Sequence, residues 1–148
     1  MEITVRELRE EDIPRLAEIE AESFSVPWSA KDFQELFTHS YCRYIVALAD
    51  GELAGSAGYR NICNEANIDN VVVAPKFRNI GIGSALMREI IAMGEAEHVE
   101  GFTLEVRVSN TAALRLYEKF GFVSEGIRPG FYERPREDAN IMWKRYTI

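Results

Sequence analysis

The fold of this chain is decided by one continuous stretch that runs from a strand through a glycine-bearing loop into a helix, Val71-Val72-Val73-Ala74-Pro75-Lys76-Phe77-Arg78-Asn79-Ile80-Gly81-Ile82-Gly83-Ser84. The apolar run ends at Pro75, and the amphipathic pattern of a helix begins at Gly83. The first N–H groups of a helix lack internal acceptors, and the helix dipole adds partial positive charge there. Glycine at positions 81 and 83 lets an anion approach the backbone without a Cβ in the way. This arrangement predicts a pyrophosphate-binding loop, with Lys76 and Arg78 as sources of positive charge.

Two other phosphate-binding patterns do not fit this loop. The Walker pattern requires a glycine, a lysine and a hydroxyl residue in succession after four intervening residues, and the loop lacks it. The dinucleotide pattern has three glycines after the first strand of a βαβ unit, whereas about four expected strands precede this loop. Taken alone, the stretch is also compatible with a glycine-rich turn that merely joins a strand to a helix.

Outward from the loop, hydrophobic spacing predicts further regular elements. The expected strands are residues 2–8, 44–49, 53–60, 66–74, 102–108, 122–127 and 140–146. The expected helices are residues 10–24, 29–37, 83–97 and 110–120. Asp50-Gly51 is a tight-turn signal between two strands, and Gly121 suits the left-handed position after a helix. This order predicts a mixed α/β sheet with helices on both faces.

The composition bounds the class of protein. The chain has 148 residues and no low-complexity or linker-like segment, so residues 1–148 are expected to form one domain. The net charge of −7 argues against direct nucleic-acid binding and suits a cationic partner, such as an amine or a basic protein tail. Cys42 and Cys63 form neither a disulfide framework nor a metal-ligand pattern. The N-terminus lacks a signal-like apolar core and no apolar run reaches membrane length, so we expect a cytoplasmic protein without membrane contact.

The order of elements, the loop Arg78-x-x-Gly81-x-Gly83 and the later helix with Asn110 and Tyr117 resemble the GCN5-related N-acetyltransferase superfamily across almost the whole chain. Four segments are similar to its bacterial ribosomal-protein-alanine N-acetyltransferase branch: Phe24…Pro27-Trp28-Ser29, Leu104-Glu105-Val106-Arg107-Val108-Ser109-Asn110, Leu116-Tyr117-Glu118-Lys119-Phe120-Gly121-Phe122 and Glu137-Asp138-Ala139-Asn140-Ile141-Met142.

The resemblance implies a fold and an activity. The fold is a mostly antiparallel, twisted sheet of about seven strands with about four helices on both faces. The implied cosubstrate is acetyl-CoA, with no metal, and the implied acceptor is the N-terminal alanine of a small-subunit ribosomal protein. A monomer or a weak dimer is expected.

The resemblance also implies roles for individual residues. The backbone of Val71, Val72 and Val73 is expected to pair with the pantetheine arm. Asn110 is expected to contact the cofactor, Glu105 to act as general base, and Tyr117 to contact the cofactor and protonate the departing thiolate. The pyrophosphate loop is expected to comprise Arg78, Asn79, Ile80, Gly81, Ile82, Gly83 and Ser84.

Elementary geometry agrees with these roles but leaves structural alternatives open. Strand alternation places Glu105 on the face opposite Leu104 and Val106, where it is either free for chemistry or paired with Arg107. Asn110 and Tyr117 lie seven residues apart and share one helix face. Taken singly, Asn110 is equally a helix N-cap, and Tyr117 an ordinary half-buried aromatic.

Aromatic residues in or near irregular segments flank the expected cleft. Phe24, Trp28 and Tyr132 are the expected acceptor-binding residues, and core anchoring is the open alternative for Trp28. The chain departs from the branch at Phe131, where a second tyrosine is usual, so one hydroxyl is missing. Other acceptors stay open, namely a lysine side chain or a small-molecule amine. A non-catalytic acyl-CoA sensor is a further alternative, but such a protein needs neither Glu105 nor Tyr117.

Overall fold

Seven strands form one sheet in the computed structural model, which describes residues 1–146 apart from the side chain of Asn70. The strands are β1 Ile3–Glu7, β2 Cys42–Ala49, β3 Glu52–Ile62, β4 Glu65–Val73, β5 Gly101–Arg107, β6 Val123–Glu133 and β7 Arg136–Arg145. Their order across the sheet is β1-β2-β3-β4-β5-β7-β6. Neighbouring strands are antiparallel except β4 and β5, which run parallel.

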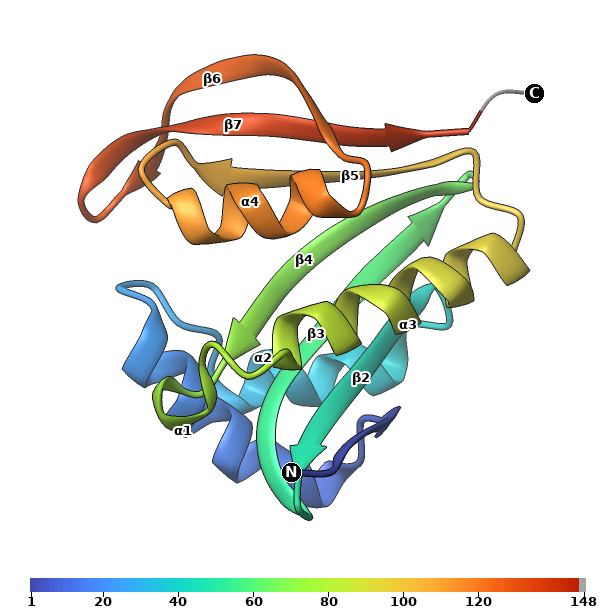
Figure 1. Cartoon of the computed structure of the whole chain (residues 1–148), viewed down its shortest axis with the longest axis vertical. Coiled ribbons are helices and arrows are strands. Elements are labelled where there is room, and N and C mark those ends of the chain that lie inside the picture. The colour runs from blue at the N-terminus through green and yellow to red at the C-terminus, as the bar shows by residue number, and fades with distance from the viewer. Residues whose placement is uncertain (147–148) are drawn as a thin grey trace.

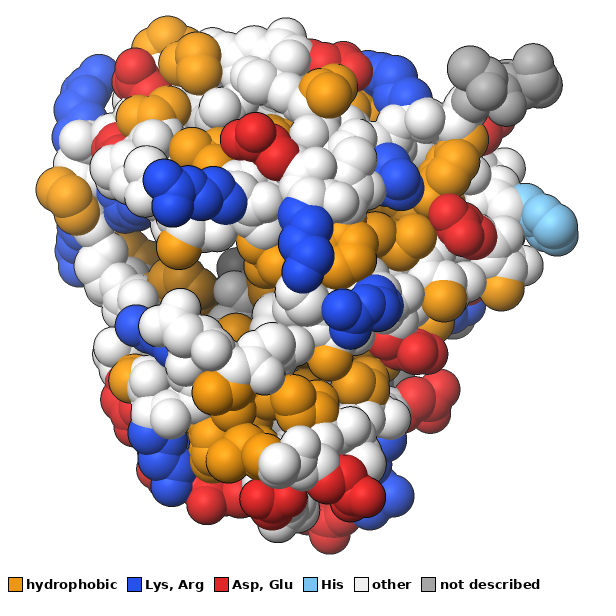
Figure 2. Space-filling model, viewed as in Figure 1, with side chains coloured by type: hydrophobic (Ala, Val, Ile, Leu, Met, Phe, Trp, Pro, Cys, Tyr) orange, Lys and Arg blue, Asp and Glu red, His pale blue; other side chains and the backbone are white. Residues whose placement is uncertain are grey.

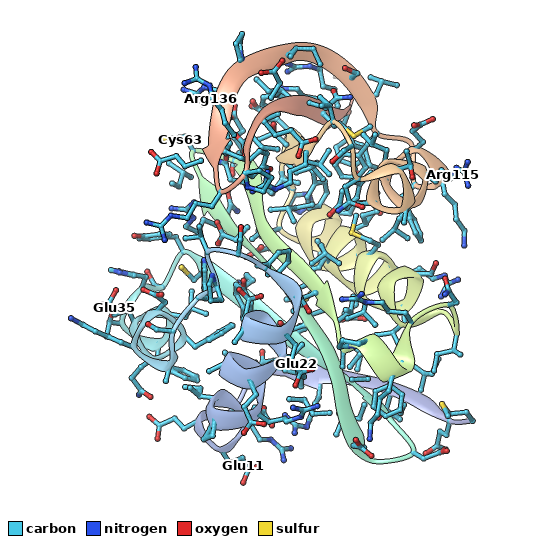
Figure 3. The ribbon with its side chains drawn as sticks, turned by 90° about the vertical axis from the view of Figure 1, so that its left-hand side faces the viewer. Glu11, Glu22, Glu35, Cys63, Arg115 and Arg136 are labelled. Carbon is cyan, nitrogen blue, oxygen red and sulfur yellow. The ribbon has the colours of Figure 1, made fainter. Side chains whose placement is uncertain are left out.

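Four α-helices cover the two faces of this sheet. They are α1 Ile13–Ser23, α2 Ala30–Glu35, α3 Ile82–Ala96 and α4 Thr111–Lys119, with short 3-10 turns at Glu10–Asp12, Leu36–Thr38 and Pro75–Phe77. The side view in Figure 3 shows α1 and α2 on one side of the strands and α3 and α4 on the other. The predicted fold class is confirmed: a mixed, mostly antiparallel sheet with helices on both faces.

The hydrophobic core between α3 and the middle strands fixes the position of that helix. Leu86 and Ile90 are fully buried on its inner face. Phe102 of β5 meets Tyr59 of β3 edge to face, with ring centroids 5.9 Å apart. A Cβ at Gly94 would lie 2.1 Å from the Phe102 ring, so α3 approaches the sheet this closely only with glycine there. The packing therefore holds the N-terminus of α3 beside the end of β4.

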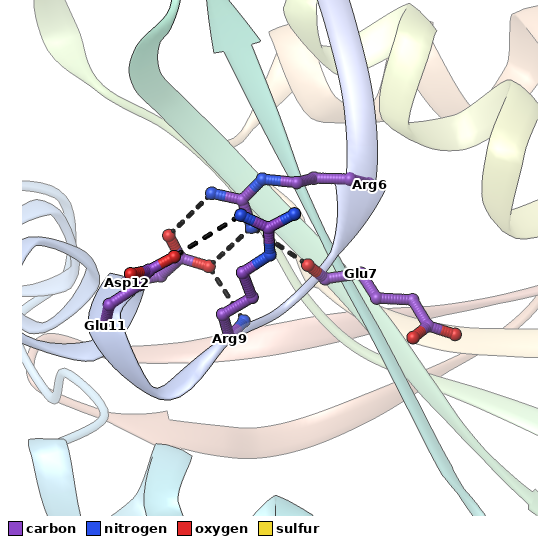
Figure 4. A network of polar contacts seen from close by, with 5 residues as sticks. All are labelled: Arg6, Glu7, Arg9, Glu11 and Asp12. Carbon is purple, nitrogen blue, oxygen red and sulfur yellow. Dashed lines mark hydrogen bonds and ion pairs between the residues drawn. The ribbon is translucent and has the colours of Figure 1, made fainter.

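A partly buried ion pair joins β1 to Asp12, the N-cap of α1 (Figure 4). Two Arg6 nitrogens donate to the two Asp12 carboxylate oxygens at 2.8 and 2.9 Å, and the Arg9 backbone N–H donates to Asp12 at 2.8 Å. Burial alone would raise the pKa of the Asp12 carboxyl, but the bonds from Arg6 and Arg9 outweigh it and leave that pKa below its ordinary value. The start of α1 is thereby anchored on the sheet.

The sheet splits between β4 and β5. The two strands pair only where Glu65–Asn67 lies beside Gly101–Thr103, and Figure 1 shows them diverging from there. The register between β3 and β4 shifts at Ala57/Tyr59, so β4 carries a bulge next to the point of divergence. Beyond Asn67 the edge of β4 that faces β5 has no strand partner among the described residues.

The last hairpin is longer than its sequence predicts. The expected strands are residues 122–127 and 140–146, and Pro129 and Gly130, which are unfavourable in a strand, follow the first of them. Instead β6 continues to Glu133, and the register with β7 shifts between Arg128 and Tyr132. The bulge absorbs both breakers: Gly130 takes a left-handed φ of 61°, and its N–H donates to Asp138 Oδ1 at 2.9 Å. Phe131 and Tyr132, expected in or near an irregular segment, lie at the end of β6, next to the β6–β7 turn.

Within residues 1–146, none of the helices combines the length and the apolarity needed to span a membrane.

Candidate active site

The free edge of β4 exposes backbone groups that a ligand can use. The Ala74 N–H donates to the Ala54 carbonyl of β3 at 2.7 Å. Backbone groups alternate between the two edges of a strand, so those of Val73 and Val71 point away from β3, toward the split. The Val73 carbonyl there accepts a bond from Arg78 Nε at 3.2 Å. Val72 is buried, and its backbone faces β3.

The loop after β4 presents the start of α3 as an anion-binding site. Asn79 and Gly81 both take left-handed φ angles, 65° and 96°. Gly81 is the N-cap of α3, and it has no side chain that could accept a hydrogen bond from the helix. The Ala85 N–H donates to the Gly81 carbonyl at 3.0 Å and is the first N–H of the helix to be bonded in this way. The three preceding N–H groups, at residues 82–84, are available to an anion.

Other side chains around the loop have separate tasks. The Ile82 side chain is 1% exposed and anchors the helix in the core, whereas that of Ile80 is 42% exposed. A Cβ at Gly83 would lie 3.1 Å from Leu116 of α4, so the two helices approach closely beside the loop. Arg78 also donates to Ser23 Oγ at 3.3 Å, which ties the loop to the end of α1.

A basic residue that sequence reasoning missed lies beside the loop. Lys119, in the last turn of α4, donates from Nζ to Ser84 Oγ at 3.1 Å. Lys76, which the sequence suggested as a source of charge, is instead ion-paired with Glu52. The sequence could have pointed to Lys119 only through its place on the same short helix as Tyr117. Lys119 reaches the loop because α4 lies close to α3.

Helix α4 supplies Asn110 and Tyr117. Asn110 is the N-cap, with Oδ1 accepting the Ala113 N–H at 3.2 Å, so its side-chain amide group stays available for other partners. The Tyr117 side chain is 7% exposed and packs on Phe122, with centroids 6.0 Å apart. Its hydroxyl forms no hydrogen bond with the part of the chain that the structure describes. Burial first, and the neighbouring Tyr132 second, raise the pKa of the Tyr117 phenol.

Glu105 lies exposed on β5, while its neighbours Leu104 and Val106 are buried, as strand alternation predicts. The open alternative, a pair with Arg107, is not formed among the described residues. Arg107 instead contacts Glu137 Oε1 at 3.2 Å and two carbonyls of the β6–β7 turn. The charge of Glu105 contributes to the raised pKa of Tyr132, after burial, so these two side chains are close.

The expected acceptor-binding residues lie in the loop between α1 and α2 and at the end of β6, and these two regions touch. The Ser25 hydroxyl, in the loop between α1 and α2, donates to the Arg134 carbonyl in the β6–β7 turn. Tyr132 lies under the Arg107 guanidinium, 4.3 Å from ring centroid to Cζ, and Phe131 packs on Tyr132 at 5.0 Å. Phe24, at the start of the first loop, is 38% exposed.

Trp28 serves the core as well as the surface. Its ring packs on Phe33 at 5.2 Å and on Tyr44 at 5.6 Å, and its backbone N–H donates to the buried Glu20 at 3.0 Å. Trp28 therefore does anchor its loop to the core, as the alternative interpretation of the sequence had it. Its other side lines a surface pocket with Asp69.

These elements surround one hollow. Figure 2 shows the surface hollowed at the left, between the half with α4, β6 and β7 and the half with α1 and β4. The structure brings Glu105, Tyr117 and Tyr132 together beside the split strands, with Asp69 of β4 near Glu105. Sequence reasoning also missed Asp69, because a single acidic residue in a strand gives no signal of its surroundings. Among the described residues, no group of three or more His, Cys, Asp or Glu side chains is arranged to bind a metal ion.

The split sheet, the helix start without a side-chain cap, and the carboxylate and phenol around the hollow define the class of N-acetyltransferases. The model of the Acetyltransferase (GNAT) family matches residues 13–122, and the chain belongs to this family.

Relatives with similar sequences cover almost the whole chain. A Bacillus subtilis (strain 168) protein named "Putative [ribosomal protein bS18]-alanine N-acetyltransferase" is 41% identical over 140 residues, or 94% of this chain and 93% of that protein. The [ribosomal protein bS18]-alanine N-acetyltransferase of Escherichia coli (strain K12) is 35% identical over 94% of this chain and 95% of its own length. The crystal structure of the ribosomal-protein-S18-alanine N-acetyltransferase from Escherichia coli superposes with a TM-score of 0.90 at 32% identity, covering 99% of this chain and 96% of that one.

Proposed function

We propose that this chain transfers the acetyl group of acetyl-CoA to the N-terminal α-amine of a protein, with the N-terminal alanine of a small-subunit ribosomal protein as the acceptor. The observation that carries the proposal is Glu105, exposed and without an ion pair among the described residues, beside the free edge of β4. The acceptor is supported by the names of the relatives, two of which are 35–41% identical to this chain.

The donor half of the site fits acetyl-CoA. The N–H groups of Val71 and Val73 and the C=O group of Val71 can pair with the amides of a pantetheine arm as an added strand would. The Val73 C=O on the same edge accepts a bond from Arg78. The N–H groups at the start of α3 can bind the pyrophosphate, with Arg78 and Lys119 nearby as cations and the Asn110 amide as a further donor. The backbone comes close to such a ligand because Gly81 carries no side chain.

An α-amine needs only modest help from a base. Its reference pKa is about 7.7–8.0, so roughly 10–15% is neutral at pH 7, whereas a lysine amine near 10.4 is neutral in only about 4 molecules per ten thousand. In the proposed role, Glu105 accepts the proton of the amine directly or through water. The neutral amine then attacks the thioester carbonyl, and an N–H of the free β4 edge near Val73 stabilises the oxyanion. The transfer is direct, so no enzyme nucleophile is required.

Tyr117 is proposed to assist the leaving thiolate. A thiol near 8.5 and a phenol near 10 make complete proton transfer uphill by about 1.5 pKa units, and burial raises the pKa of Tyr117 further. We therefore assign the Tyr117 hydroxyl first as a hydrogen-bond donor to the sulfur, with proton transfer coupled to collapse of the intermediate. A phenol that stays neutral is well suited to donating this bond.

A thiol-release assay with acetyl-CoA tests the proposal. Short peptides that begin with alanine are expected to release CoA, whereas polyamines and aminoglycosides are not. Turnover with the small amines alone would replace the proposed acceptor by a small-molecule amine. Tight CoA binding without turnover on any amine would replace the enzyme by an acyl-CoA sensor.

A further inference from the structure

A pocket of about 320 Å³ lies on the α1/α2 face of the sheet, beside the hollow described above. Its walls come from α2 and the turn that follows it, and its floor comes from β2, β3 and β4. Glu35, which Figure 3 labels on α2, lies at its outer side, and Asp69 of β4 lies at its floor. The phosphate loop contributes none of its walls.

One carboxylate oxygen of Asp69 has no hydrogen-bond partner among the described residues. The side chain is 8% exposed, and both Arg60 contacts, from Nε at 3.1 Å and from Nη2 at 2.8 Å, go to Oδ1. Oδ2 is buried and accepts no hydrogen bond from the described residues. A buried carboxylate oxygen left in this state is costly, because it has lost its water without gaining a donor. A donor that enters from the pocket would remove that cost.

The charge and the aromatic surfaces of the pocket favour a cation as the entering group. Asp32, Glu35 and Asp69 outnumber the single cation Arg60. Aromatic rings also line the pocket: His39 is stacked on Tyr41 at 5.1 Å, and Tyr41 is 40% exposed. Carboxylates together with aromatic faces are the surroundings that proteins offer to guanidinium and ammonium groups.

The pocket lies near the proposed base, Glu105, through its floor residue Asp69. Asp69 and Glu105 each lie two residues beyond the last paired residues of β4 and β5, Asn67 and Thr103, and therefore on neighbouring strands where the sheet splits. Burial raises the pKa of the Asp69 carboxyl, Arg60 opposes this, and the charge of Glu105 adds to it. A peptide with its α-amine at Glu105 therefore has the pocket within reach of the side chains that follow its first residue.

We infer that this pocket binds an arginine or lysine side chain among the first residues of the acceptor protein, with Asp69 at its floor and Glu35 at its rim. This inference rests on the proposed function, because it takes the amine of a peptide to lie at Glu105. The pocket would then select acceptors by a basic residue, separately from the chemistry at the amine.

Two series of alanine-starting peptides test the inference. In one series, arginine or lysine occupies position 2, 3 or 4, and in the other series glutamine occupies the same positions. For the position that reaches the pocket, the native enzyme is expected to show about ten-fold higher kcat/KM with the basic residue, mainly through KM. Glu35→Gln is expected to shrink that preference while leaving the rate with the glutamine peptide unchanged. Asp69→Asn is also expected to shrink the preference, measured as the ratio of kcat/KM between the two series.

The controls separate the possible results. Glu35 is exposed and has no ion pair among the described residues, so Glu35→Gln reports on the pocket even if Asp69→Asn fails to fold. Glu89→Gln removes the same charge from exposed α3 and is expected to leave the preference intact. Equal kcat/KM for both series would overturn the inference while leaving the proposed function standing. If no peptide is acetylated, the proposed function fails. Calorimetry with the two peptide series then still tests whether the pocket binds a basic side chain, and equal affinities for the two series would reject the inference.

Discussion

The proposed donor half and the proposed acceptor half of this site are built in different ways. The donor half is one continuous run, from Val71 to Ser84, and it presents mainly backbone groups at a free strand edge and a helix start. The acceptor half collects side chains from separate segments, among them Trp28, Glu105 and Tyr132. Backbone groups are the same in every sequence, so substitutions of side chains in the acceptor half can leave ligand binding by the donor half unaffected. In the proposed function, these side chains are the part of the site that selects the acceptor.

The largest expected effect comes from removing the base of the acceptor half. Glu105→Gln is expected to lower kcat by about a hundred-fold, the range of one general base, because the amine must then lose its proton to water. The dissociation constant of acetyl-CoA is expected to stay the same, as measured by calorimetry. Glu118→Gln, an exposed substitution on α4, is the matched control. A weaker acetyl-CoA affinity in Glu105→Gln would show that the two halves are not separable.

A smaller effect is expected where the two halves meet. Tyr117→Phe should lower kcat by about ten-fold or more, the value of one hydrogen bond to a developing charge, with little change in acetyl-CoA affinity. Because burial raises the pKa of Tyr117, its phenol stays protonated as the pH rises through 10. The native enzyme should therefore show no fall in kcat from this group between pH 8 and pH 10. An unchanged kcat in Tyr117→Phe would remove Tyr117 from the mechanism.

The smallest effect tests the backbone of the donor half. Gly81 has a φ of 96°, where an L-residue costs about 1–2 kcal/mol, although its Cβ would meet no atom within 4 Å. Gly81→Ala is expected to distort the loop and raise the dissociation constant of acetyl-CoA by about five-fold. The KM for the peptide should not change. Gly126→Ala, where a Cβ also meets nothing and φ is not left-handed, is the control. Equal affinities in the two variants would contradict the role of the loop backbone.

The same difference explains what could be predicted from the sequence. The strand, loop and helix of the donor half follow from local chemistry, because Pro75 ends an apolar run and glycines precede an amphipathic helix. The seven strands and four helices were also predictable, since their hydrophobic periods are clear. The proposed roles of Glu105 and Tyr117 came from the family resemblance. No local sequence pattern predicted which residues surround them.

What the sequence could not show depends on contacts between distant segments. Lys119 reaches Ser84 only because α4 packs beside α3. Asp69 lies near Glu105 because β4 and β5 pair up to Asn67 and Thr103, two residues before each carboxylate. The length of β6 was underestimated for a similar reason. A carboxylate from β7, Asp138, binds the Gly130 N–H and allows the strand to continue past a residue that usually ends one.

The most direct test of the account is to find which amine is acetylated. A peptide with an N-terminal alanine and an internal lysine, incubated with acetyl-CoA and the enzyme, can be sequenced by tandem mass spectrometry. The account predicts one acetyl group, on the alanine α-amine, and no product when that amine is blocked. Acetylation of the lysine, or continued turnover on the blocked peptide, would contradict it.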